Sequence, residues 1–196
     1  MLVLLKSTKA TRKPDEAWQY CDMNTDTLAL LSEQVSGKKF AELLSELFDD
    51  FGANHEGSIA KNSDGSFSPS YGISISARDY ALFHQWIAQG KAPESYYASV
   101  TDPSKTKFGE DEIAQGTFPG VRYGSQSYYI HGNDVIFSSG SYGQSGYSDL
   151  KTGVAVIFLS DWAVNWEVDK GLDNRYRAIA IINYLRSSIS SYLRSL

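Results

Sequence analysis

The feature that most constrains the fold is a run of short apolar segments between residues 127 and 159. The β-rich segments are 127–130, 134–139, 142–148 and 154–159. The dipeptide Gly132-Asn133 and the Lys-Thr-Gly at 151–153 separate neighbouring segments as tight turns. Strands joined by such short turns pair antiparallel, so we predict an antiparallel meander. The last segment, VAVIFL, is continuously apolar, which indicates a central strand covered on both faces.

Amphipathic helices precede and follow this meander. Apolar residues recur at helical spacing and stop near a glycine in 22–37, 40–52 and 76–90. Residues 53–71 and 91–116 are polar and rich in turn formers, so we expect loops there. A closing helix is expected over 175–196, with Leu185 on its inner face.

These elements predict one α+β domain over residues 1–196. A mainly helical region occupies 1–116, and 117–196 form the antiparallel sheet with the C-terminal helix over one face. The 196 residues suit one domain or the larger part of one. Because the sequence opens on four apolar residues with no strand before them, we expect that part of the domain is missing.

Charge and composition exclude several classes of function. The net charge of -5 argues against a nucleic-acid partner or an anionic membrane surface. Leu2–Leu5 is too short for a signal peptide or a membrane span, and the compartment stays open. One cysteine and three scattered histidines form no metal-binding pattern, so we expect no metal and no cofactor. Thirteen tyrosines and four tryptophans are typical of a chain that lines pockets with aromatic rings.

Tyr20 stands immediately before a helix whose first residues favour capping. Asp22, Asn24 and Thr25 are helix N-cap types, and a carboxylate at Asp26 favours the helix dipole. A side chain in this place can be directed into a site. This stretch alone favours the other interpretation, a half-buried tyrosine in a turn.

Three stretches together resemble the β-lactamase-related serine hydrolases, which include class C β-lactamases, DD-peptidases, esterases and 6-aminohexanoate-dimer hydrolases. They are Tyr20-Cys21-Asp22 followed by NTDTLALLSEQVSG, then SPSYGISISARDYALF at 68–83, and GSYGQSGY at 140–147. The last stretch stands where the family has its third motif, K-T-G or H-x-G. The resemblance covers nearly the whole chain and implies the C-terminal portion of such a fold.

The resemblance implies acyl transfer, in which a serine of an S-x-x-K motif attacks a carbonyl and the lysine and a tyrosine move protons. It makes Tyr20 the proton-transfer base and Asp22 its orienter. A free tyrosine has a pKa near ~10, so it acts as a base only where cations stabilise the phenolate. The third-motif strand would supply oxyanion and substrate contacts through Ser141, Tyr142, Gly143 and Gln144. A bulged strand with a glycine that eases packing would explain this stretch equally well.

The serine nucleophile itself is not found where the resemblance requires it. S-x-x-K belongs upstream of Tyr20, and the residues before Tyr20 contain no serine followed three residues later by lysine. Matches occur downstream at Ser36–Lys39, Ser58–Lys61 and Ser104–Lys107. We interpret them as a solvated helix end and two loop positions. The literal K-T-G at 151–153 is interpreted as a hairpin turn.

Two departures from the family shape the functional prediction. Ser141 replaces the Lys or His of the third motif, which argues against binding a β-lactam carboxylate, and Asp22 replaces a frequent Asn. Both favour an esterase- or amidase-like hydrolase of small substrates. This chain alone is predicted to be inactive and to bind its missing N-terminal half, or to self-associate through an exposed strand edge and helix face. The alternatives are a non-catalytic binding or scaffold domain of the same fold and an unrelated α+β binding module.

Overall fold

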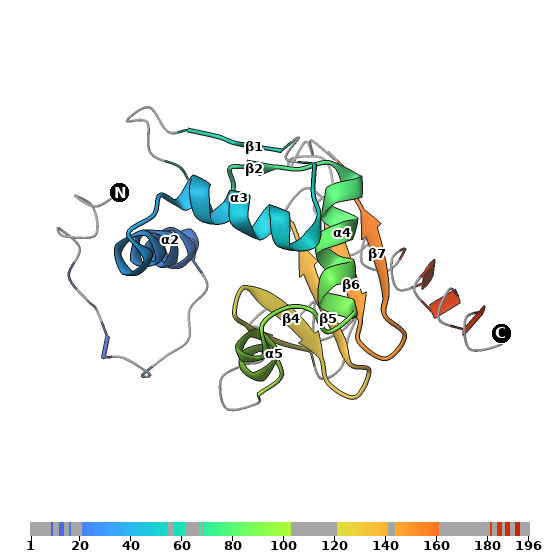
Figure 1. Cartoon of the computed structure of the whole chain (residues 1–196). Helices are drawn as coiled ribbons and strands as arrows, with labels where there is room; N and C mark the ends of the chain where they lie inside the picture. The colour runs from blue at the N-terminus through green and yellow to red at the C-terminus, as the bar shows by residue number, and fades with distance from the viewer. Residues whose placement is uncertain are drawn as a thin grey trace, which may run out of the picture. The chain divides into compact units, whose positions relative to one another are not determined.

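The computed structural model describes residues 9, 12–13, 16, 21–54, 57–61, 67, 69–102, 121–140, 144–160, 181, 184–185, 187–188 and 191–192. These residues form helices and antiparallel strands in the order shown in Figure 1, which confirms the predicted α+β class. Contacts group the chain into two compact units, residues 1–76 and 77–196, and each is described by itself. Within the described ranges, no helix is long and apolar enough to cross a membrane.

Two helices dominate the first unit, α2 (Asp22–Ser36) and α3 (Phe40–Phe51), and both end at the predicted glycines. Gly37 and Gly52 adopt the left-handed conformation, with φ of 71° and 75°, which is the usual helix stop for glycine. At its other end, α2 differs from the prediction. The N-cap position is Cys21, which has an extended backbone and makes no side-chain cap, so Asp22 lies in the first turn instead.

A short hairpin completes the first unit. Strand β1 (Ser58–Ile59) pairs antiparallel with β2 (Ile73–Ser74), so the predicted loop over 53–71 contains a strand. Two-residue strands are too short to show alternation in a sequence, which explains the error. An apolar pocket opens beside α3 and this hairpin. Its lining residues are Ala41, Leu44, Ser45, Phe48, Gly57, Ser58, Ile59 and Ile73.

The second unit contains the predicted meander. Its strands are β3 (Val121–Gly124), β4 (Ser127–Ile130), β5 (Val135–Ser139), β6 (Ser145–Asp149) and β7 (Val154–Phe158). Each strand pairs antiparallel with the next along the chain. Strand β3 was not predicted. Among the described strands β7 is outermost and only its middle residue is buried, so the predicted central position is wrong.

One face of this sheet carries a row of aromatic rings, one from each of four consecutive strands. Tyr123, Tyr128, Phe137 and Tyr147 lie directly opposite one another in the register. Their ring centroids are 4.7, 4.7 and 5.0 Å apart. Directly opposed aromatic pairs contribute about 0.2–1 kcal/mol each, so the row ties the strands together beyond their backbone bonds.

Two helices pack against the opposite face, α4 (Ala77–Ala88) and α5 (Glu94–Thr101). Helix α4 lies along β6 and β7, while α5 lies beside β3 and β4 (Figure 1). Ile87 of α4 and Val100 of α5 join Ile136 of β5 in a buried cluster. The predicted long loop over 91–116 therefore contains a helix, because two turns of aromatic and apolar residues gain stability by packing on the sheet.

The predicted closing helix over 175–196 is only partly described. Residues 181, 184–185, 187–188 and 191–192 have helical backbone, and the remainder lies outside the described residues. Leu185, expected on the inner face, is 40% exposed. Coverage of the sheet by this helix therefore stays a prediction.

Candidate functional site

On the predicted proton-transfer side, only Asp22 is described. It is exposed and occupies the first residue of α2, where the helix dipole favours an ionised carboxylate. Tyr20, the predicted base, lies outside the described residues. Its role and its orientation by Asp22 therefore stay predictions.

On the predicted substrate side, Gln144 is described, while Ser141, Tyr142 and Gly143 lie outside the described residues. Gln144 directly precedes β6 and is half-buried, and β6 begins at Ser145, three residues after the predicted start of this strand at 142. The backbone N–H of Gly140 donates to the Gln144 carbonyl at 2.7 Å and closes the β5–β6 hairpin. Gln144 belongs to residues 77–196 and Asp22 to residues 1–76, so their convergence on one site stays a prediction.

Two serines lie opposite each other at the base of this connection. Ser139 ends β5, Ser145 begins β6, and the two are directly paired. Ser145 is fully buried, and neither hydroxyl has a hydrogen-bond partner in the described part of the chain.

The downstream S-x-x-K matches have structural explanations where they are described. Ser36 ends α2, is exposed, and donates its hydroxyl to the Ser32 carbonyl at 2.6 Å. Ser58 is exposed as well, on strand β1 rather than in the predicted loop. Ser104 lies outside the described residues. Neither described serine occupies the first turn of a buried helix.

The literal K-T-G at 151–153 forms the turn between β6 and β7, as predicted. Gly153 has φ of 70°, and its N–H donates to the Asp149 carbonyl at 2.9 Å. The Asp149 carboxylate accepts the backbone N–H groups of Lys151 and Thr152 at 3.0 and 3.2 Å. Lys151 is half-exposed and pairs with Asp134 at 3.2 Å, so its ammonium links this turn to the β4–β5 turn.

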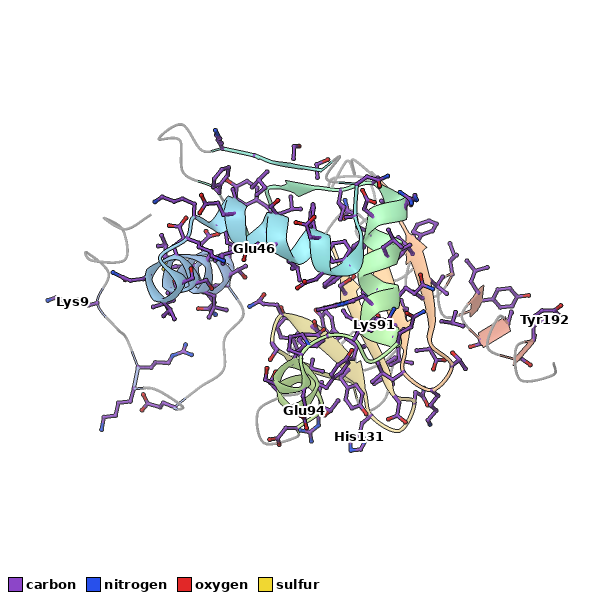
Figure 2. The ribbon with its side chains drawn as sticks, viewed as in Figure 1. Lys9, Glu46, Lys91, Glu94, His131 and Tyr192 are labelled. Atoms are coloured by element: carbon purple, nitrogen blue, oxygen red, sulfur yellow. The ribbon has the colours of Figure 1, made fainter. Side chains whose placement is uncertain are left out.

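A buried polar cluster around His84 was not predicted from the sequence. His84 lies on α4, is 1% exposed, and contacts two neighbouring strands of the sheet, β5 and β6. Its Nε2 lies 3.0 Å from the Ser138 hydroxyl on β5, and its Nδ1 lies 2.9 Å from the Ser148 hydroxyl on β6. The Tyr80 hydroxyl also hydrogen-bonds to Ser138. By contrast His131 is exposed at the β4–β5 turn (Figure 2).

The hydrogen-bond partners determine which atom donates in this cluster. The Ser148 hydroxyl donates to the His84 backbone carbonyl at 2.8 Å, so it can only accept from Nδ1. Nδ1 therefore carries the proton, and Nε2 accepts from Ser138. Ser138 in turn accepts from Tyr80. This assignment of donors and acceptors requires that His84 is neutral.

Burial reinforces the neutral state of these groups. It lowers the pKa of His84 to about 3, because an imidazolium would lose its hydration. Burial likewise raises the pKa of the Tyr80 hydroxyl, which its hydrogen bond with Ser138 only partly offsets. The cluster is thus suited to holding α4 against β5 and β6 rather than to exchanging protons with solvent. In the described ranges, no three His, Cys, Asp or Glu side chains are grouped as metal ligands.

Comparison with known proteins finds two similar hydrolases. No family model matches the chain. It is 29% identical over 155 residues to a curated 6-aminohexanoate-dimer hydrolase of Paenarthrobacter ureafaciens, covering 74% of this chain and 39% of that protein. A solved Bacillus anthracis structure, provisionally assigned as a 6-aminohexanoate-dimer hydrolase, superposes with a TM-score of 0.63 at 20% identity. That match covers 98% of this chain and 48% of the other.

The curated match supports a β-lactamase-related serine hydrolase family, and the resemblance found in the sequence is confirmed. At 20% identity the solved structure supports the fold alone. The chain spans less than half the length of either relative.

Proposed function

We propose that this chain is part of a serine hydrolase that cleaves ester or amide bonds through an acyl-enzyme. The observation that carries the proposal is the 29% identity to a curated 6-aminohexanoate-dimer hydrolase along 74% of the chain. The name of that relative describes hydrolysis of a 6-aminohexanoate dimer. A small ester or amide is therefore the substrate class that we assign to the complete site.

In the proposed site, Tyr20 takes the proton from the serine nucleophile and Asp22 orients the tyrosine. Ser141, Tyr142, Gly143 and Gln144 contact the substrate and the developing oxyanion. The tyrosine can act at neutral pH only beside a cation, because its ordinary pKa is near ~10. In this family, the lysine of S-x-x-K would supply that charge.

The nucleophile is proposed to come from a segment other than the described helices. Ser36 and Ser58 are exposed and lie on no buried helix, and no S-x-x-K precedes Tyr20 in this sequence. We therefore propose that the chain is inactive by itself. A complementary segment of the family fold, or a second copy, would cover the apolar side chains that α2 exposes, Leu28, Leu31 and Val35.

The first test is an assay of the purified chain with p-nitrophenyl esters, nitrocefin and short amides. We expect no serine-dependent turnover. Turnover that is lost in Ser36→Ala, Ser58→Ala or Ser104→Ala would contradict the proposal.

A longer product, translated from the reading frame before Met1, provides the complementary test if it contains S-x-x-K. There we expect fluorophosphonate labelling, and Tyr20→Phe should lower kcat about 10²–10⁴-fold. Tyr71→Phe is the matched control, because Tyr71 is 72% exposed and lies outside the proposed site.

A non-catalytic binding or scaffold domain is the second candidate. The observation that favours it is the lack of an S-x-x-K before Tyr20 in this sequence. A longer frame that also lacks the motif, with no fluorophosphonate label, would favour this candidate over the hydrolase.

A further inference from the structure

His84 of α4 contacts both strands of the β5–β6 hairpin, whose end lies next to Gln144. The imidazole hydrogen-bonds to Ser138 on β5 and Ser148 on β6, and these residues are 54 and 64 positions away along the chain. Ser138 is followed by Ser139 and then by Gly140, whose N–H closes the hairpin on Gln144. The ring therefore contacts both strands that lead to this connection.

Gly146 makes this close approach to β6 possible. It is the register partner of Ser138 and lies under the His84 ring. A Cβ at this position would overlap Nε2 and its neighbouring ring carbons. The backbone at Gly146 has no positive φ, so its conformation does not require glycine. Glycine is required because a side chain here would collide with His84.

We propose that His84 is a positioning residue that holds β5 and β6 in place against α4 and so fixes the end of their hairpin at Gln144 for substrate. The inference rests on the proposed function in assigning Gln144 to the substrate side. The positioning itself follows from the geometry. The neutral ring has one donor and one acceptor, and each is used on a different strand. A rotation or shift of either strand would leave a buried polar atom unpaired, which is costly.

The test compares two backbone amides of the same sheet in the same molecule. Gly140 N–H donates to Gln144 O two residues beyond Ser138, and Asn133 N–H donates to Ile130 O at the β4–β5 turn, next to neither serine that His84 contacts. Hydrogen exchange of both is measured by NMR in the full chain and in His84→Phe, which keeps a ring but loses both hydrogen bonds. We expect Gly140 to exchange about tenfold faster relative to Asn133.

Two further variants make the result decisive. Gly146→Ala places a methyl group against the ring and is expected to shift the same ratio in the same direction, should His84→Phe fail to fold. Ser139→Ala is the matched control, because this neighbour of Ser138 faces the other side of the sheet and should leave the ratio unchanged. Equal acceleration of both amides, or none, in the two test variants would overturn the proposal.

Activity provides an independent measurement in a hydrolytically active longer product. His84→Phe should lower kcat/KM about tenfold, because Gln144 is assigned to contacts with the substrate and the developing oxyanion. If the exchange ratio shifts but no form of the protein hydrolyses esters or amides, the positioning stands and the hydrolase proposal fails. If hydrolysis is found and the exchange ratio does not shift, the hydrolase proposal stands and the positioning proposal fails.

Discussion

His84 makes the stability of the second unit depend on pH at the scale of a single residue. Its pKa is about 3 in the fold, against 6.5 for the exposed side chain. Between these two pH values only the unfolded chain binds the proton, so the free energy of unfolding falls as the pH drops from ~6.5 toward 3. Above pH ~6.5 the contribution of His84 to stability is constant. We expect a loss of about 2 kcal/mol between pH 7.5 and pH 5.

Urea unfolding at a series of pH values measures this loss. His84→Gln should remove most of the dependence above pH ~5, where carboxylates contribute little. His131→Gln is the control, since that side chain is exposed. An unchanged pH dependence in His84→Gln would contradict the assignment.

Residue-scale features of this site were only partly predictable. The N-cap residue types around Asp22 correctly indicated a helix start within a few positions. The role of His84 could not be found in the same way, since Ser138 and Ser148 lie far away in sequence and only the register of β5 and β6 brings them to one ring. A single histidine on an apolar helix face carries no local signal of such a contact.

At the scale of the element, the β6–β7 turn depends on Asp149. Its carboxylate is 3% exposed and accepts two backbone N–H groups of the turn. Asp149→Ala should therefore cost about 1–3 kcal/mol of unfolding free energy, because those donors lose their acceptor.

Chemical denaturation of Asp149→Ala beside Lys151→Ala separates turn structure from surface charge. Lys151 pairs with Asp134 while 54% exposed, so its removal should cost less than about 1 kcal/mol. A larger loss in Lys151→Ala than in Asp149→Ala would show that the lysine, and not the buried carboxylate, organises this turn.

Elements with strong local signals were the ones that the sequence predicted. The left-handed glycines after α2 and α3 and the turn at 151–153 are examples. Strand β3 was missed because Ser125 and Gln126 form its turn with φ of 49° and 60°, and neither residue type signals positive φ. Helix α5 was missed because its stability comes from packing against the sheet.

At the scale of the whole molecule, we expect the chain to self-associate. Leu28, Leu31 and Val35 lie on one face of α2 and are 51%, 51% and 88% exposed. Burying an exposed leucine contributes about 1.5–3 kcal/mol. Replacing all three by Gln should therefore weaken association by at least about tenfold.

Light scattering after size exclusion, over a range of concentrations, measures this association. Gln34→Ala on the same helix is the matched control, because it changes an exposed polar residue. A monomer at every concentration that binds no hydrophobic dye would argue against an apolar interaction surface.

The sequence by itself determined the α+β class, the antiparallel meander, the helices that end at glycines and the resemblance to the hydrolase family. Each depends on local periodicity, on backbone conformations that few residue types adopt, or on motif order. Only the tertiary structure decided that α5 packs on the sheet, that β7 is outermost among the described strands, and that His84 joins α4 to β5 and β6. Those features arise from contacts between residues distant along the chain, which the register of the strands brings together.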